Sequence, residues 1–348
     1  MKQKRITIKD VAEKAGVSTA TVSHVINETR FVRDETKAKV INAMEKLSYY
    51  SSRHAKFLAT GKTYTIGLVV SDISNPFFPQ IISGIEELAS HSGYDIMLFN
   101  TNYEAGNIKA AAKKFIEYRV DGVMVMTTEV EYGIINMLNE NDIPLVFLDW
   151  GVTGNLVSDI KENFNSGIDE AVEYLVQLGH KNIALIAGPL EFRTSIMRKN
   201  SFLESVKKYD GNILKTEVFE ADFKIEGGRK VFDQLHHSAN PPTAVLASND
   251  LMAIGVMQQA KKCNVKIPEE LSIIGIDNIF FAPYLDPALT SICIPREAIY
   301  QNAWKVMMNF LENDETMGKE IMVDTWLVKR DSASRPGMKG EEEKRDEG

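Results

Sequence analysis

The chain has 348 residues, of which 44% are hydrophobic and 25% charged, as in a soluble globular protein of two or three domains. No apolar run approaches the roughly 20 residues that span a bilayer. The basic N-terminus has no secretory pattern behind it, so we expect a cytoplasmic protein rather than a membrane or exported one. The two cysteines, Cys263 and Cys293, lack metal or redox spacing, and we expect no metal and no cofactor.

The net charge of −8 is unevenly distributed. Residues 1–62 contain 13 Lys and Arg against 6 Asp and Glu, a net charge of +7, so the rest of the chain carries −15. A basic segment on an acidic body is typical of a protein that meets nucleic-acid phosphate at one end. A solvated, Lys-rich helical surface would give the same charge, so the sequence pattern has to decide.

Residues 7–47 have the pattern of three short helices. Thr7 and Asp10 form a start that resembles a capping box. Gly16 then breaks the apolar pattern, and Ser18 can cap a second helix. Three short helices, the first two joined by a tight Gly-containing turn, indicate a helix-turn-helix unit. The buried stripe expected for the third helix consists of Val40, Ile41, Met44 and Leu47.

Residues 48–61 have little apolar periodicity and indicate a linker or hinge. From residue 64 onward, strand-like and helix-like segments alternate. The expected strands of the first run lie near 66–70, 95–100, 121–126 and 144–150. After residue 163 the alternation restarts, with strands near 183–188, 216–221, 243–248 and 271–277. Repeated βαβ units predict an α/β fold with two parallel sheets, each covered by helices on both faces.

Polar residues follow several of these strands at their carboxyl ends. They are Ser71, Thr127 and Asp149 in the first run, and Asn249 and Asp277 in the second. In open α/β sheets, ligands bind beyond the carboxyl ends of the strands. Two lobes that face each other across a cleft would place these residues around one small polar ligand.

The segment TIKDVAEKAGVSTATVSHVIN (7–27) is similar to the headpiece of the lac repressor (LacI/GalR) family of transcription regulators. The resemblance continues to about residue 335 through AKFL, NPFF, RVDGVMVM, LDW, GHKNIALIAGPL, SNDLMAIG and PALTSI. Within the family, the chain looks most like the purine and ribose repressors. The resemblance implies an all-α headpiece, a two-lobed core like periplasmic binding proteins with two doubly wound sheets, and a homodimer on near-palindromic operator DNA.

The resemblance also implies the domain limits. The headpiece is expected at residues 1–48, the hinge at 49–62, the core at 63–335 and a disordered charged tail at 336–348. Within the core, lobe 1 would comprise about 63–162 and 292–325, and lobe 2 about 163–291. The tail contains no leucine heptad, which favours a dimer over a tetramer.

By resemblance, the second helix enters the major groove, and Thr19, Ala20 and His24 stand where the family reads base edges. Small side chains can contact a thymine methyl, and an imidazole can bond guanine. The implied phosphate contacts are Thr7, Ser18, Thr21, Ser23 and Asn27. In the hinge, Leu58 holds the place of a minor-groove wedge, with Ala55 and Lys56 beside it. The family's usual Pro before this helix is replaced by Ser51.

The effector site implied by the resemblance combines aromatic and hydrogen-bonding side chains. Aromatic rings cover the apolar side of a sugar, while charged and amide groups bind its hydroxyls. The implied residues are Phe77, Phe78, Asp149, Trp150, Thr194, Arg198, Phe223, Asn249 and Asp277. Phe192 stands where the purine repressor has a basic residue, and Ile196 where ribose binders have an arginine. A pentose or sugar phosphate is the expected effector, and a purine corepressor is the alternative.

Two other classes of protein fit less well. ATGKT (59–63) has the end of a phosphate-binding loop, but Lys56 stands where that motif needs glycine. No metalloprotease motif or nucleophile elbow occurs, so we expect no enzyme. A sugar-binding transport protein would share the core but would need an export signal and would lack the helix-turn-helix. The sequence therefore favours an allosteric DNA-binding repressor, with induction favoured over corepression.

Overall fold

The computed structural model describes residues 6–27, 30–49, 61–127, 132–313 and 315–337. The chain divides into two compact units, residues 1–65 with 119–121, and residues 66–118 with 122–348. We call the first the headpiece unit and the second the core unit. The hinge residues Ala55, Lys56 and Leu58 and residues 338–348 of the tail lie outside the described residues. None of the described helices is both long and apolar enough to cross a membrane.

The headpiece unit contains the three expected helices, α1 (Ile8–Ala15), α2 (Thr19–Asn27) and α3 (Asp34–Lys46). The backbone N–H and the hydroxyl of Thr7 donate to the Asp10 carboxylate at 2.7 and 2.6 Å, which fixes the start of α1. Gly16 ends α1 with φ 67°, a left-handed conformation that glycine adopts without a steric cost. This conformation allows the tight turn into α2.

Each of the three helices contributes one stripe of buried residues to the small core of this unit. Val11, Val22 and Val40 are completely buried at its centre. The prediction that Ile41 belongs to the stripe of α3 is wrong, because 43% of its side chain is exposed. Ala43 takes its place, since positions 40, 43, 44 and 47 share one helical face and position 41 is rotated away from it.

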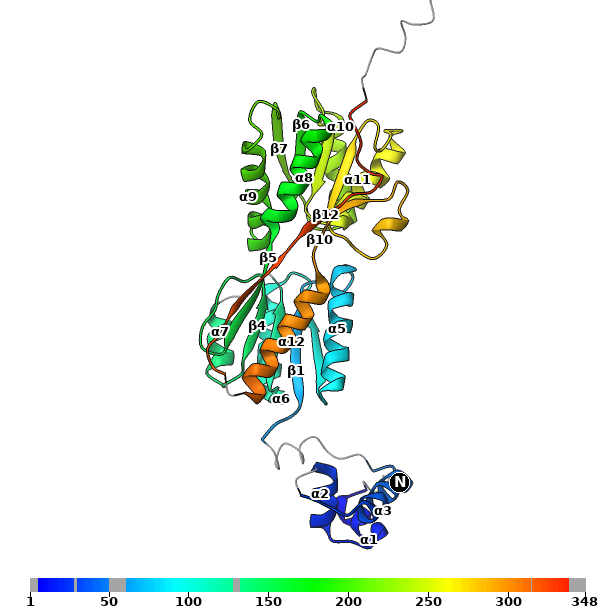
Figure 1. Ribbon diagram of the computed structural model, residues 1–348, viewed down its shortest axis with the longest axis vertical. Helices are drawn as coiled ribbons and strands as arrows, with labels where there is room; N and C mark the ends of the chain where they lie inside the picture. The colour runs from blue at the N-terminus through cyan, green and yellow to red at the C-terminus, as the bar shows by residue number, and fades with distance from the viewer. Residues whose placement is uncertain (1–5, 28–29, 50–60, 128–131, 314, 338–348) are drawn as a thin grey trace, which may run out of the picture. The chain divides into compact units, whose positions relative to one another are not determined.

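The core unit contains two six-stranded sheets (Figure 1). The first, in lobe 1, has the order β11-β5-β4-β3-β1-β2, and the second, in lobe 2, has the order β12-β10-β9-β8-β6-β7. The strands of lobe 1 are β1 (Thr65–Val70), β2 (Asp95–Asn100), β3 (Gly122–Met126), β4 (Leu145–Leu148), β5 (Val157–Asn163) and β11 (Glu320–Asp324). Those of lobe 2 are β6 (Asn182–Ala187), β7 (Lys215–Glu220), β8 (Ala244–Ala247), β9 (Ser272–Asp277), β10 (Thr290–Cys293) and β12 (Trp326–Val328).

Helices cover both sheets. In lobe 1, α5 and α12 lie side by side, and α6 contacts α7; in lobe 2, α8 contacts α9, and α10 contacts α11 (Figure 1). Their bounds are α5 (Phe77–His91), α6 (Ala105–Tyr118), α7 (Tyr132–Asn139), α8 (Phe164–Leu178), α9 (Arg193–Lys207), α10 (Ile225–His236), α11 (Asp250–Lys262) and α12 (Arg296–Glu312). A short 3-10 helix, η1 (Ala282–Tyr284), follows β9. The fold predicted from the sequence is confirmed.

Burial explains why the central strands read as continuous apolar runs. All six residues of β1 and all six of β9 are buried, as expected for parallel strands covered on both faces. β3, β4, β5 and β11 pair in parallel, and so do β7, β6, β8, β9 and β10. Only the short β12 pairs antiparallel, with β10, among the strand pairs whose register is described.

The chain crosses between the lobes after β5, after β10 and after β11, close together at the waist of the core unit (Figure 1). Thr325 holds two of these crossings together. Its hydroxyl donates to the Asn163 carbonyl at 2.8 Å and accepts the Gly167 N–H at 3.0 Å. Asn163 in turn donates to Asp324 at 2.8 Å. These crossings bring the carboxyl ends of the two sheets to face each other.

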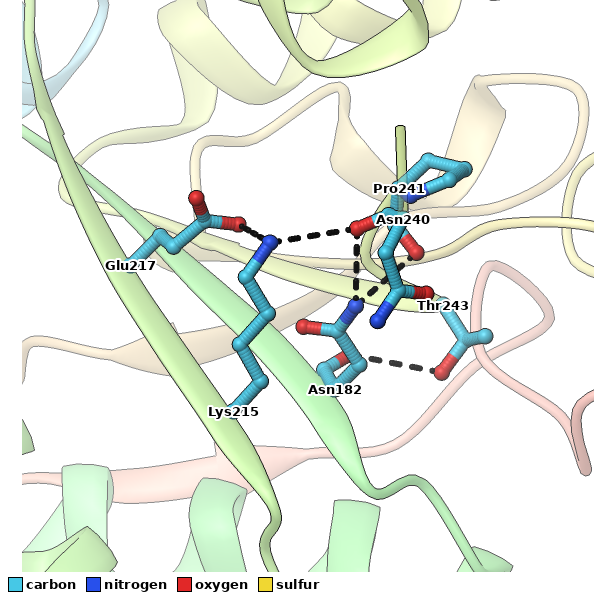
Figure 2. Close-up of polar contacts among 6 residues, drawn as sticks. All are labelled: Asn182, Lys215, Glu217, Asn240, Pro241 and Thr243. Atoms are coloured by element: carbon cyan, nitrogen blue, oxygen red, sulfur yellow. Dashed lines mark hydrogen bonds and ion pairs between the residues drawn. The ribbon is translucent and has the colours of Figure 1, made fainter. Parts of the chain in front are cut away.

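The opposite, amino end of the lobe 2 sheet is closed by a polar network (Figure 2). The Asn182 amide donates to the carbonyls of Asn240 and Pro241 at 3.1 and 3.0 Å. Lys215 forms an ion pair with Glu217 at 2.7 Å and donates to the Asn240 carbonyl at 3.2 Å. These contacts supply hydrogen-bond donors to the backbone carbonyl groups of the loop before β8. We therefore assign them a structural role at the end of the sheet remote from the cavity described next.

Candidate effector cavity and DNA-binding helix

A cavity of about 80 Å³ lies between the carboxyl ends of the two sheets. Residues from both lobes line it. From lobe 1 they are Ser71, Asn75, Phe77, Phe78, Tyr103, Met126, Thr127, Leu148, Asp149 and Glu162; from lobe 2 they are Thr194, Arg198, Phe223, Asn249 and Asp277. The position agrees with the rule that open α/β sheets bind ligands beyond the carboxyl ends of their strands.

Strand ends supply most of the polar lining. Ser71 follows β1, Thr127 follows β3 and Asp149 follows β4. Glu162 is the last residue but one of β5, and Asp277 is the last residue of β9. The hydroxyl of Ser71 donates to that of Thr127 at 3.0 Å. Because each strand ends at the same edge of its sheet, residues far apart in sequence converge on one small volume.

Aromatic rings line the cavity from both lobes. Phe77 and Phe78 begin α5 and meet edge to face, with ring centroids 5.2 Å apart, and the Asn75 side chain accepts the Phe77 N–H at 3.0 Å. Tyr103 of lobe 1 stacks on Phe223 of lobe 2, with centroids 6.1 Å apart and ring planes 24° apart. Tyr103 also stacks on Phe192, at 5.8 Å and 22°. The rings of Tyr103, Phe192 and Phe223 thus connect the two lobes.

Asn249 and Arg198 already have partners in the protein. The Asn249 side chain caps α11 by accepting the Met252 N–H at 2.9 Å, and its amide donates to the Phe223 carbonyl at 2.8 Å. Arg198 donates to the Ser248 carbonyl, and its guanidinium lies 4.5 Å from the centre of the Phe164 ring. Each side chain retains hydrogen-bonding capacity for a ligand, but much of that capacity serves to hold the wall of the cavity.

Three carboxylates line the cavity in nearly complete burial: Asp149, Glu162 and Asp277 are 6%, 4% and 3% exposed. Burial, with repulsion from Asp159, raises the pKa of Asp149 to about 7. Burial raises the pKa of Asp277 to about 6, although Arg198 and Arg296 oppose the shift. Burial and the neighbouring Asp149 carboxylate raise the pKa of Glu162 well above its ordinary value. Burial therefore disfavours the charged form of all three carboxyl groups.

Four lining residues have a left-handed backbone that is rare outside glycine. Their φ angles are 57° at Asp149, 61° at Tyr103, 61° at Phe223 and 114° at Asp277. Such conformations cost of order 1–3 kcal/mol each and gather at binding sites. Hydrogen bonds hold the one at Asp277, because Arg296 donates to the carbonyls of Asp277 and Asn278, the latter at 2.9 Å.

Of the expected effector residues, the cavity brings together all except Trp150. The Trp150 ring packs against Phe147 with centroids 6.0 Å apart, and its backbone N–H donates to Asp159 at 2.9 Å. Trp150 is not one of the residues that line the cavity. Lining residues that the sequence analysis missed are Asn75, Tyr103, Met126, Leu148 and Glu162.

In the headpiece unit, the residues expected to read bases lie on the outer face of α2. Thr19 and Ala20 are exposed, and His24 is half-buried. The hydroxyl of Ser18 accepts the Thr21 N–H at 3.1 Å and bonds the Thr21 hydroxyl at 2.9 Å. These two expected phosphate contacts therefore also cap α2. Ser23 is half-buried, Thr7 is exposed, and Asn27 ends α2 with its side chain outside the described part of the structure.

A helix-turn-helix unit followed by a two-lobed core with a polar cavity defines the class of ligand-responsive, DNA-binding transcription regulators. Comparison with known proteins agrees. Residues 7–52 match the family described as bacterial regulatory proteins, lacI family, and residues 172–333 match a periplasmic binding protein-like domain.

The HTH-type transcriptional repressor PurR of Pectobacterium atrosepticum is 36% identical over 94% of this chain and 97% of its own. A lac repressor dimer bound to operator and an anti-inducer is similar in structure, with a TM-score of 0.83 and 27% identity over 95% of this chain and 100% of its own. A LacI family regulator of Enterococcus faecium with bound ribose has a TM-score of 0.70 and 28% identity over 78% of this chain and 99% of its own. The chain belongs to the lacI family and is a DNA-binding transcriptional repressor, not an enzyme.

Proposed function

We propose that the protein is a homodimer whose affinity for a near-palindromic operator is controlled by a small sugar in the cavity between its lobes. It would act in the cytoplasm, where operator DNA is found. The headpiece (1–48), hinge (49–62) and two-lobed core (63–335) would each have the role that the family resemblance assigns. The residues of β12, which pair with β10, would extend lobe 2 beyond its expected limit at 291.

The observation that carries the proposal is the combination of buried polar groups and aromatic rings in one cavity. Within the described residues, both carboxylate oxygens of Asp149, Nε of Arg198 and Oδ2 of Asp277 are buried without a hydrogen-bond partner. Leaving such groups unsatisfied costs roughly 1–3 kcal/mol each. A ligand that has hydroxyls on its rim and an apolar face for Phe77 and Phe78 would satisfy them, and a monosaccharide has both.

The aromatic stack favours a sugar over a planar base. Two rings that hold a third between them must be separated by about twice the stacking distance of 3.5 Å, or about 7 Å. The ring centroids of Tyr103 and Phe223 are only 6.1 Å apart, so no third ring fits between them. A base could stack there only after Tyr103 leaves. A sugar could be held from the side by Phe77 and Phe78 without displacing Tyr103, and the Enterococcus faecium regulator holds ribose.

A purine remains the second candidate ligand. The relative named PurR is 36% identical to this chain. Phe223, Thr194 and Asp277, which are among the effector residues implied by the family resemblance, all line the cavity. Against it, Phe192 occupies the place of a basic residue and stacks on Tyr103. The proposal therefore favours a sugar inducer.

On DNA, α2 would lie in the major groove, with Thr19, Ala20 and His24 at base edges and Thr7, Ser18, Thr21, Ser23 and Asn27 at phosphates. The hinge residues Ala55, Lys56 and Leu58 would lie in the minor groove of a bent operator. Two-fold symmetry of a dimer would impose a near-palindrome of roughly 14–20 base pairs.

A thermal-shift screen of sugars, sugar phosphates and purine bases, followed by operator binding with each hit, tests the proposal. We expect a sugar to raise the melting temperature and to lower operator affinity. If purine bases alone stabilise the protein, the sugar assignment is wrong. If no hit changes operator binding, control by a ligand in this cavity is wrong.

A further inference from the structure

One aromatic side chain of lobe 1 packs into lobe 2. Tyr103 lies in the loop between β2 and α6, yet its ring stacks on Phe192 and Phe223 of lobe 2, with centroids 5.8 and 6.1 Å away. Among the described residues that pack against the hydrophobic core of lobe 2, Tyr103 is the one that lobe 1 contributes. Its loop belongs to none of the three chain crossings, so the stack joins the lobes independently of the waist.

The backbone of lobe 1 holds Tyr103 in place for this contact. Tyr103 and its neighbour Asn102 have left-handed backbones, with φ angles of 61° and 53°. The hydroxyl of Thr101 accepts the Tyr103 N–H at 3.3 Å, and the Asn107 amide donates to the Thr101 carbonyl at 2.9 Å. A tyrosine keeps a left-handed backbone only where the surrounding structure determines it. The loop therefore presents the ring of Tyr103 to the opposite lobe in a fixed position.

Lobe 2 presents the two partner rings from equally fixed positions. Asn249 donates to the Phe223 carbonyl at 2.8 Å, and Gly188 leaves room for the Phe223 ring, since a Cβ there would lie 2.0 Å from it. Phe192 comes directly before α9 and packs against the core of lobe 2. Because both partner rings are held in lobe 2, the lobes can separate here only if the Tyr103 ring leaves them.

Another contact between the lobes lies at the waist itself. Arg296, at the start of α12, donates to the carbonyls of Asp277 and Asn278 of lobe 2. Arg296 comes just after β10, so it moves with one of the chain crossings. A contact beside a hinge changes little when two domains rotate about that hinge, whereas a contact on a separate loop has to break. Of the two contacts, the stack of Tyr103 is therefore the one that opposes opening of the lobes.

We propose that Tyr103, Phe192 and Phe223 form an aromatic clasp, in which the Tyr103 ring of lobe 1 holds the two lobes closed over the cavity. The inference goes beyond the proposed function, because it concerns the resting arrangement of the lobes whichever ligand the cavity takes. Two stacked aromatic pairs shift the ratio of closed to open molecules roughly tenfold or more. Lobes that are already closed present both walls of the cavity in position, so less of a ligand's binding free energy is lost in bringing them together.

The first test measures how often the cavity opens in the full-length protein without added ligand. Ser71→Cys places a thiol in the cavity, because Ser71 is 2% exposed and belongs to the lining. The reaction of this thiol with N-ethylmaleimide is followed by peptide mass spectrometry, and its rate is proportional to the fraction of open molecules when opening is fast. Cys263, at the end of α11 in lobe 2, reacts in the same molecule and is the internal reference.

Four variants of this protein are compared. Tyr103→Ala should raise the labelling rate roughly tenfold relative to the reference thiol. Phe192→Ala should raise it several-fold, and because Phe192 does not line the cavity, its effect cannot come from a hole in the cavity wall. Tyr103→Phe keeps the ring and should keep the original rate. Tyr118→Ala removes a tyrosine of the same lobe that is 62% exposed, and it should also leave the rate unchanged.

A double variant tests whether the two side chains act through their contact. Adding Phe192→Ala to Tyr103→Ala should raise the labelling rate no further, because the pair that it removes is already lost. Effects that multiply would show that the two side chains act independently, and they overturn the proposal. Unchanged labelling in Tyr103→Ala overturns it as well. If Tyr103→Ala does not fold, Phe192→Ala decides from the side of lobe 2, and an unchanged rate there has the same consequence.

The second test measures the distance between the lobes by double electron–electron resonance. Nitroxide labels are attached at Lys109→Cys and Asn200→Cys, two exposed positions on α6 and α9, with Cys263 and Cys293 replaced by serine. Dilution with unlabelled protein makes distances within one subunit dominate. We expect a longer distance to gain population in Tyr103→Ala relative to the protein with Tyr103 intact. Identical distance distributions, together with a raised labelling rate, would show a local gap in the wall instead of open lobes and would overturn the clasp.

These outcomes are independent of the proposed function. If the variants open the lobes as expected but no sugar changes operator affinity, the clasp stands and control by a sugar fails. If a sugar controls operator affinity but labelling rates and lobe distances are the same in all variants, the proposed function stands and the clasp fails.

Discussion

Gly188 lies immediately after β6, against the ring of Phe223, and its replacement by alanine tests how the cavity wall is packed. A Cβ at this position would lie 2.0 Å from Cζ, 2.3 Å from Cε1 and 2.5 Å from Cε2 of Phe223. Ordinary carbon contacts are about 3.5–4.0 Å, so the ring would have to move by roughly 1.5 Å. Tyr103 stacks on that ring, and Asn249 holds the Phe223 carbonyl, so the ring cannot move without disturbing the cavity.

We expect Gly188→Ala to destabilise the core by about 1–3 kcal/mol, the usual cost of overpacking, and to weaken effector binding at least about tenfold. Gly133→Ala is the matched control, because it lies within α7 and a Cβ there would meet nothing within 4 Å. It should stabilise the protein by up to about 1 kcal/mol. Denaturant unfolding followed by tryptophan fluorescence measures both. Equal stability of the two variants, with unchanged effector affinity, would refute the packing described for Phe223.

Four further predictions concern the headpiece, the hinge and the cavity. Thr7→Ala should cost about 1 kcal/mol of headpiece stability by removing the hydroxyl bond to Asp10, as measured by thermal unfolding, and no loss would show that this cap is unimportant. Operator affinity should fall by a factor on the order of 10³ or more between 50 and 200 mM salt in anisotropy titrations, and a flat salt dependence would argue against phosphate contacts by the headpiece. Leu58→Ala should weaken operator binding far more than non-specific binding, whereas equal losses would assign Leu58 to packing. Asp277→Ala should abolish the response to effector and leave operator binding without effector intact; a normal response would remove Asp277 from the site.

The sequence predicted the parts of the fold that depend on local pattern. Strands β6, β7, β8 and β9 of lobe 2 lie within about a residue of their expected ranges, because buried parallel strands form short, continuous apolar runs. β5, β10, β11, β12 and α12 were not predicted individually. β5 mixes charged residues with apolar ones although most of it is buried, and only the tertiary crossing between lobes explains that pattern.

The cavity was predicted through strand ends and through family resemblance. Ser71, Thr127, Asp149, Asn249 and Asp277 follow recognisable strands and do line the cavity. Tyr103 was missed because it reaches the cavity through a loop with positive φ angles at residues 102 and 103, which no apolar period reveals. Glu162 was missed because β5 was not recognised as a strand. The position of Glu162 just before α8, where the second run of helices and strands begins, was the one indication in the sequence that it could line the cavity.

The central claim is that a small ligand in the core controls operator binding by the headpiece. Fluorescence anisotropy of a labelled near-palindromic operator, titrated with the protein at fixed salt with and without a sugar identified by thermal shift, tests it most directly. A ligand can shift the DNA-binding equilibrium only by its difference in affinity for the two states of the protein. We predict that the sugar lowers operator affinity at least about tenfold in the wild type and not in Asp277→Ala. An operator affinity that stays the same at saturating sugar in the wild type would contradict the account.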